Sequence, residues 1–129
     1  MCAPRQTLAR IAVVIALSAG AASGPARAQD RRVIHVSAER FSFSPSEIVL
    51  ESGEEVELRL TSEDTAHGFH IAGTDIDVVL PKRGQGDASV VVRLDAPGRY
   101  EFECSKMCGA GHDFMRGTLV ARAPAGRDR

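Results

Sequence analysis

Hydrophobic and polar residues alternate along most of the chain from residue 33 onward. In EVELRLTS, residues 55–62, valine and leucine take every second position, and charged or hydroxyl side chains take the others. A period of two is typical of a β-strand with one buried face. Similar patterns predict further short strands at 33–39, 41–45, 47–52, 67–73, 75–81, 88–95, 99–104 and 116–123. Turn residues separate them, and no helix is predicted, so we expect an all-β sandwich of seven or eight strands.

The first 28 residues follow another pattern. Two arginines precede the apolar run IAVVIALSAGAA, residues 11–22, and the small-residue stretch PARA follows it. This order is typical of a secretory signal peptide, and the run is shorter than the roughly 20 residues that cross a bilayer. We predict cleavage between Ala28 and Gln29, a single domain at 29–129, and a periplasmic or otherwise exported protein. A retained N-terminal anchor is the alternative.

Charge and composition limit the classes of binding partner that are expected. The 13 basic and 17 acidic residues of 29–129 give a net charge of −4. No basic patch is interleaved with aromatics, so nucleic acid is not expected, and no later apolar run predicts a membrane span in the mature chain. The acidic residues near the fourth predicted strand are expected to form a solvated edge, with docking of a basic cytochrome as the alternative. They are Glu54, Glu55, Glu57, Glu63 and Asp64.

The stretch CSKMCGAGHDFM, residues 104–115, concentrates the candidate chemistry. Its spacing is C-x3-C-x3-H-x2-M, formed by Cys104, Cys108, His112 and Met115. Thiolate, imidazole and thioether ligands together suit copper. A mononuclear blue-copper site uses one cysteine, so the second thiolate could bridge a second copper. His67, which follows a turn and begins a predicted strand, is the best candidate for a second histidine.

Three other readings of this stretch remain open. Cys104 and Cys108 could form a disulfide, which an exported protein would retain. The same cysteines could bind structural zinc with His67 and His112, although this leaves Met115 without a role. A mononuclear copper site is the third reading.

The stretch resembles the binuclear copper (CuA) loop of cytochrome c oxidase subunit II, which the C-terminal domain of nitrous oxide reductase also carries. SEDTAHGF, PGRYEFEC and FSFSPSEIVLESGEEVELRLTS resemble other parts of that family, so the resemblance runs from about Phe41 to Val120. It implies a cupredoxin-like Greek-key β-sandwich.

The resemblance also implies a ligand set for two copper ions. The cysteines would bridge the ions, each histidine would bind one of them, and the methionine would be a weak thioether ligand. The residue between the cysteines would contribute its backbone carbonyl. The positions that match are His67, Cys104, Lys106, Cys108, His112 and Met115.

Two departures from the family bear on its partners. The family usually has glutamate at the position of Lys106, where the side chain reaches a magnesium ion in the oxidase, so that contact is in doubt. A positive charge there should also raise the reduction potential. The chain has no tryptophan, through which the oxidase subunit is thought to receive electrons.

These features predict an exported CuA-type protein that performs one-electron transfer. A c-type cytochrome or a terminal oxidase subunit would be its redox partner. No catalytic residue is expected, because any oxidase activity would belong to a complex. The alternative is a periplasmic copper carrier or chaperone with the same fold.

Overall fold

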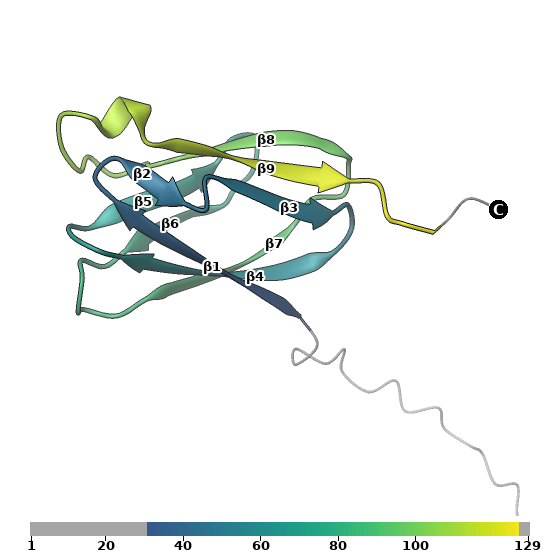
Figure 1. The fold of residues 1–129 in the computed structure, drawn as a ribbon, viewed down its shortest axis with the longest axis horizontal. Helices are drawn as coiled ribbons and strands as arrows, with labels where there is room; N and C mark the ends of the chain where they lie inside the picture. The colour runs from purple at the N-terminus through teal and green to yellow at the C-terminus, as the bar shows by residue number, and fades with distance from the viewer. Residues whose placement is uncertain (1–30, 127–129) are drawn as a thin grey trace, which may run out of the picture.

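The predicted alternation becomes nine strands in the computed structural model, which describes residues 31–126 (Figure 1). The predicted signal peptide lies outside these residues. The elements are β1 (Arg32–Glu39), β2 (Ser42–Ser44), β3 (Glu47–Glu51), β4 (Glu55–Ser62), β5 (His67–Ile71), β6 (Asp77–Leu80), β7 (Ala88–Arg93), β8 (Gly98–Glu103), the 3-10 turn η2 (His112–Phe114) and β9 (Arg116–Arg122). Several strands end one or two residues before the predicted bound. Nine strands are counted because the segment at 41–45 forms a separate short strand.

The strands form two sheets that face each other. One has the order β2-β1-β4-β7, and the other has the order β3-β9-β8-β5-β6. β1 runs parallel to β4, and β3 runs parallel to β9, while the remaining pairs are antiparallel. The chain therefore passes from one sheet to the other between β2 and β3. The all-β sandwich predicted from the alternation is confirmed.

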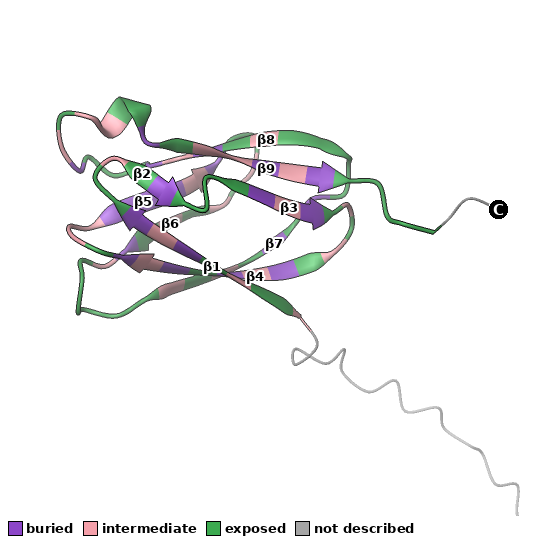
Figure 2. Cartoon of the chain, viewed as in Figure 1, coloured by how far each residue is buried: buried purple, intermediate pink, exposed green. Residues whose placement is uncertain are grey.

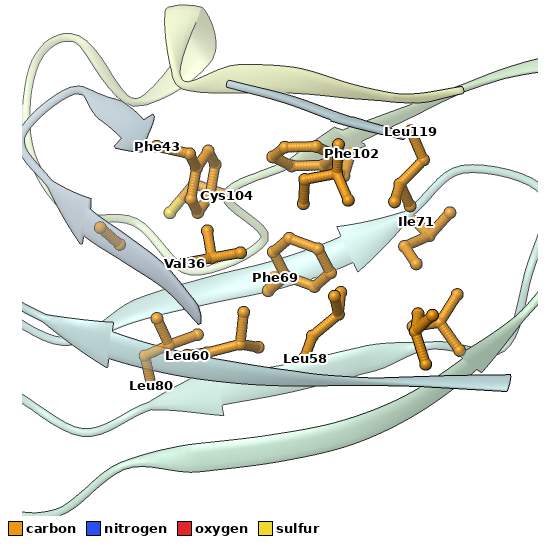
Figure 3. Close-up of a cluster of buried hydrophobic side chains, with 14 of the residues drawn as sticks. Val36, Phe43, Leu58, Leu60, Phe69, Ile71, Leu80, Phe102, Cys104 and Leu119 are labelled. Carbon is orange, nitrogen blue, oxygen red and sulfur yellow. The ribbon is translucent and has the colours of Figure 1, made fainter. Parts of the chain in front are cut away.

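The core lies between the two sheets, where the inward-facing residues of the alternating strands meet (Figure 2). β4 shows this most clearly, since Val56, Leu58 and Leu60 are fully buried and the charged residues between them are not. Phe69 occupies the centre, with Phe102 on one side and Leu58 on the other (Figure 3). Its ring centroid lies 4.9 Å from that of Phe102. These side chains bring the sheets together by removing apolar surface from water.

Three connections meet at one end of the sandwich, which lies on the left in Figure 1. They are the β1–β2 turn at 40–41, the β4–β5 turn at 63–66, and the β8–β9 loop at 104–115. Cys104, at the start of that loop, lies beside Phe43 at the margin of the core (Figure 3). The fold thus places the cysteine-containing loop next to His67, the first residue of β5.

Candidate metal centre

The β8–β9 loop is closed at its base and turned at its tip by backbone hydrogen bonds. The N–H of Cys104 donates to the carbonyl of Met115 over 3.0 Å, which joins the first and last residues of the stretch. At the tip, the N–H of His112 donates to the carbonyl of Gly109 over 3.2 Å, and the N–H of Phe114 to that of Gly111 over 3.0 Å. The sequence analysis predicted no helix, and the short turn η2 forms here. It directs His112 and Met115 back toward the cysteines.

The two cysteine sulfurs lie side by side without bonding. Cys104 Sγ and Cys108 Sγ are 3.7 Å apart, and both residues are buried and free. A disulfide would bring the sulfurs to about 2.05 Å. Two thiolates that share one tetrahedral ion, each about 2.3 Å from it, lie roughly 3.8 Å apart. The observed separation therefore suits metal ligation.

Each sulfur has its own histidine. Cys104 Sγ lies 3.9 Å from Nδ1 of His67, and Cys108 Sγ lies 3.7 Å from Nδ1 of His112. The ligand atoms of His67, Cys104 and Cys108 all fall within 4.8 Å of one another, and His112 lies outside that cluster. The donors are therefore spread along the pair of sulfurs.

Two further donors face the sulfurs. Met115 is fully buried, and its Sδ lies 3.9 Å from Cys108 Sγ. The carbonyl oxygen of Lys106 lies 3.1 Å from Cys104 Sγ. The structure thus brings together all six positions singled out in the sequence. Their roles as ligands stay predictions.

Asp64 fixes the orientation of the buried His67 ring. Asp64 Oδ1 lies 2.6 Å from Nε2 of His67, so the proton belongs on Nε2 and the lone pair of Nδ1 faces Cys104. Carboxylates beside histidines commonly fix the ring of a metal ligand in this way. Desolvation raises the pKa of Asp64, but hydrogen bonds from the backbone N–H of Arg40 and from His67 outweigh it, and the pKa lies below its ordinary value.

Arg40 connects the two halves of the centre. Its backbone N–H donates to Asp64 Oδ2 over 2.9 Å, and its side-chain Nε donates to the carbonyl of Cys108 over 2.7 Å. The neighbouring Phe41 packs its ring against Gly109 and Gly111, where a Cβ atom would lie within 2.9 Å of ring atoms. The β1–β2 turn therefore holds both the His67 side and the Cys108 side of the loop.

Burial keeps the Cys108 thiol protonated at neutral pH in the absence of metal. Burial, followed by the hydrogen bond with Cys104, raises the pKa of the Cys108 thiol to about 11. Because a metal binds the thiolate, copper uptake near neutral pH must release this proton. Two apolar side chains of the loop are exposed, since Phe114 is 83% exposed and Met107 is 73% exposed. The Met107 side chain therefore points to solvent.

The predicted acidic edge needs correction. Glu54, Glu55 and Glu57 each form an ion pair with an arginine of the chain, so this edge is largely neutralised. Asp64 belongs to the metal centre and not to the edge. The sequence analysis missed the supporting roles of Asp64 and Arg40. Asp64 lies three residues before a candidate ligand, and this spacing could have indicated its role. No local pattern links Arg40 to Asp64 and Cys108, which lie 24 and 68 positions further along the chain.

The fold and the sulfur-rich centre together define a cupredoxin-like domain with a His-Cys-Cys-Met metal site whose donors fit copper. The chain belongs to the cupredoxin-like domain family, whose model matches residues 8–121. It is related to the copper domains of cytochrome c oxidase subunit II and nitrous-oxide reductase, as the resemblance implied.

Two relatives illustrate this relationship. The chain is 40% identical over 91 residues to cytochrome c oxidase subunit 2 of Thermus thermophilus, an alignment that covers 69% of this chain and 64% of that protein. It is 33% identical over 105 residues to nitrous-oxide reductase of Ralstonia nicotianae, covering 78% of this chain and 16% of the reductase. The chain therefore spans less than two thirds of either relative.

Solved structures agree on the fold. A heme-copper terminal oxidase dimer superposes with a TM-score of 0.63 at 26% identity, over 74% of this chain and 67% of the matched chain. The periplasmic domain of cytochrome oxidase subunit II of Bradyrhizobium japonicum superposes with a TM-score of 0.64 at 13% identity, over 71% and 84%. Within residues 31–126, no helix is long and apolar enough to cross a membrane.

Asp64→Asn is expected to weaken copper binding by about 10- to 100-fold. Arg40 and His67 both donate to the carboxylate, and an asparagine amide would oppose one of them with its NH₂ group. Competition with a copper chelator measures the effect. Glu63→Gln, the same change at the exposed neighbouring residue, should leave the affinity unaltered. Equal affinities in the two variants would contradict the role given to Asp64.

In the copper-free protein, Asp64→Asn should also make the free energy of unfolding depend less on pH in the acid range. Because folding lowers the pKa of Asp64, its contribution is present above the unfolded-state pKa of about 3.9 and is lost as pH falls through the lower folded-state value. Chemical unfolding at several values of acid pH tests this, and an unchanged profile in Asp64→Asn would contradict it.

Proposed function

We propose that this chain is an exported electron-transfer protein with a binuclear CuA-type centre. Cys104 and Cys108 would bridge two copper ions, with His67 on one ion and His112 on the other. Met115 and the Lys106 carbonyl would complete the set. The observation that carries the proposal is the separate histidine on each sulfur, at 3.9 and 3.7 Å. A mononuclear site would need both imidazoles to converge on one point.

Bound copper supplies one-electron redox chemistry. The chain's own residues would keep the ligands in place for it. Asp64 and Arg40 hold His67 and the Cys108 carbonyl, and the Cys104–Met115 backbone bond fixes the ends of the loop. Because Cys104 is 4% exposed and Cys108 is 6% exposed, the sulfurs are shielded from water and from other thiols. Ligands held this rigidly change little in geometry when an electron arrives.

The burial of the ligands also bears on the alternative of a copper carrier. A carrier needs ligands that an acceptor protein can reach and displace. Here His67 and Met115 are completely buried, and only His112 among the side-chain donors is partly accessible. This arrangement favours a resident redox centre. Slow loss of copper to a chelator would support the redox function, and ready transfer to an acceptor protein would support the carrier.

We propose that the redox partner, a c-type cytochrome or a terminal oxidase subunit, docks over the β8–β9 loop. The half-buried His112 lies beside the exposed Phe114 and is the side-chain donor nearest to solvent. Exposed aromatic and methionine side chains are favoured at protein interfaces. The Lys106 side chain is exposed here as well, and its positive charge does not suit a magnesium ligand.

Replacing both Met107 and Phe114 by alanine is expected to slow electron exchange with a c-type cytochrome by about tenfold, through loss of apolar contact. Stopped-flow spectroscopy at fixed ionic strength measures the second-order rate. Copper spectra should stay unchanged, because neither side chain faces the sulfurs. Val33→Ala, at an exposed valine on β1, is the control. An unchanged rate in the double variant would move the docking site elsewhere.

The copper centre itself is tested by stoichiometry and electron paramagnetic resonance on copper-loaded protein. Two coppers per chain, with one unpaired electron coupled equally to both nuclei, are expected. One copper per chain would reject the binuclear proposal and favour a mononuclear site. No copper, with Cys104 and Cys108 oxidised to a disulfide, would reject electron transfer as the function and leave only the fold.

A further inference from the structure

The edges of the two sheets are protected to different degrees. Among the described strands, β2 and β7 are the edges of one sheet, and β3 and β6 are the edges of the other. β2 has three residues, and β6 has four and stops at Pro81. On β3, the Arg32 side chain donates to the carbonyl of Val49. Short strands, proline and charged side chains are the usual means of blocking edge-to-edge pairing.

β7 has less of this protection, since it is longer than the other edge strands and Arg93, at its end, is its only charged residue. Its six residues, ASVVVR, include three consecutive valines and no proline, and Val91 is 43% exposed. Only β4 pairs with it among the described strands. In Figure 1 it runs along the lower margin of the sandwich, and Figure 2 shows exposed residues along it. A strand of this kind offers its free backbone groups to another strand.

The pairing with β4 determines which backbone groups of β7 are free. The carbonyl of Leu94, which directly follows β7, accepts a hydrogen bond from the N–H of Gly53 in the turn before β4, so Leu94 faces the β4 side. Backbone direction alternates along an antiparallel strand. Val92 and Val90 therefore also face β4, while the N–H and C=O groups of Ser89 and Val91 point away from the sheet.

We propose that two copies of this chain pair through antiparallel β7 strands, with Val90 on the two-fold axis. In this register Ser89 faces Val91 of the other copy, so their outward backbone groups can exchange hydrogen bonds. Asp87 faces Arg93 of the other copy, and the two-fold axis repeats this pair of opposite charges. Arg93 already bonds Asp95 through Nε over 2.8 Å, which leaves its two Nη groups for the second carboxylate.

Neighbouring registers lack this complementarity. With Val91 on the axis, Asp87 would face Asp95 of the other copy, which places like charges opposite each other twice. With Ser89 on the axis, Arg93 would face Gln85 and Asp87 would face Val91. Because opposite charges across a strand pair stabilise it and like charges destabilise it, the register with Val90 on the axis is preferred.

The proposed dimer would leave the β8–β9 loop, at the metal centre, accessible in both copies. Ala88, at the start of β7, pairs with Leu60 near the metal-loop end of β4. Antiparallel pairing therefore directs the two metal-loop ends away from each other, at opposite ends of one continuous eight-stranded sheet. Each copy could exchange electrons with its own partner without displacing the other.

Sedimentation equilibrium on the copper-loaded protein tests the dimer. The wild type should show a reversible monomer–dimer equilibrium, and Arg93→Asp and Asp87→Arg should each weaken it by at least about tenfold, because each creates two like-charge pairs. The double variant Asp87→Arg/Arg93→Asp restores opposite charges and should restore association to near the wild-type level. Arg122→Asp, an equal change of charge on β9 in the other sheet, is the control.

The double variant tests the register in which the two β7 strands pair, as well as the surface through which the copies associate. A wild type that stays monomeric up to about 1 mM, where weak interfaces still associate, would overturn the proposal. So would single variants that associate as well as the wild type, or a double variant that stays as weak as the single ones. Copper absorption spectra, expected to be unchanged in all four variants, verify that each is folded.

Discussion

For the proposed binuclear centre, Cys108→Ser is expected to reduce the copper content from two ions per chain to one or none. Serine nearly preserves the shape of the side chain, but its hydroxyl keeps its proton at neutral pH and is a hard ligand. The substitution would remove the sulfur that lies 3.7 Å from both Cys104 Sγ and His112 Nδ1. The remaining donors then resemble a mononuclear set of one thiolate with imidazole and thioether. Copper analysis and the hyperfine pattern in electron paramagnetic resonance measure the change.

Two further variants provide comparisons for Cys108→Ser. Cys104→Ser removes the other sulfur, with His67 as its neighbour, and should cause a loss of the same kind. Met107→Leu changes an exposed side chain in the same loop and should keep two coppers with the wild-type spectrum. If Cys108→Ser retained two coppers and an electron shared equally between them, the bridging role of Cys108 would be wrong.

Gly68→Ala is expected to have the largest effect on stability, about 1–3 kcal/mol, together with weaker copper binding. A Cβ at residue 68 would overlap Ser105 Oγ and would lie 2.7 Å from the backbone nitrogen of Lys106. Backbone atoms cannot rotate away, so the loop must move. That movement would displace the Lys106 carbonyl from the sulfurs and would disturb the contact between Gly68 N–H and Cys104 Sγ.

Thermal unfolding of the copper-free protein measures the stability loss, at about 4–8 °C for each kcal/mol in a domain of this size. Gly73→Ala is the matched control, since a Cβ there meets nothing within 4 Å. Its positive φ of 78° should cost about 1 kcal/mol through backbone strain, with copper affinity unaffected. Wild-type copper affinity in Gly68→Ala would show that the close approach of β5 and the loop has no part in holding the metal.

The fold could be predicted to a large extent because alternation is a local signal. The strict period of two in residues 55–62 predicted the bounds of β4 correctly, and the turn residues located most other strands within three residues. Sheet partners were less accessible to sequence reasoning. The parallel pairing of β3 with β9 joins segments about 70 residues apart, and no local pattern encodes it.

The residues of the candidate centre also differ in how far the sequence could predict them. Five of its six predicted positions lie within twelve residues, so spacing alone could bring them together. His67 could be associated with them because it was expected to begin a strand beside a turn, and it does begin β5. Asp64 was misinterpreted as part of a solvated acidic edge, since a carboxylate near a turn is usually exposed. Arg40 could not be found, because its contacts depend on how the β1–β2 turn packs against the loop.

The position of β9 has a consequence for the order of assembly. β9 is the last strand within residues 31–126, and it lies between β3 and β8 in the five-stranded sheet. The backbone bond that closes the copper loop uses Met115, immediately before β9. A chain that is still being synthesised or translocated lacks this strand, and pairings between distant segments form slowly. Metal insertion would therefore follow the pairing of β9, so that an exported chain could cross a membrane unfolded and acquire copper on the far side.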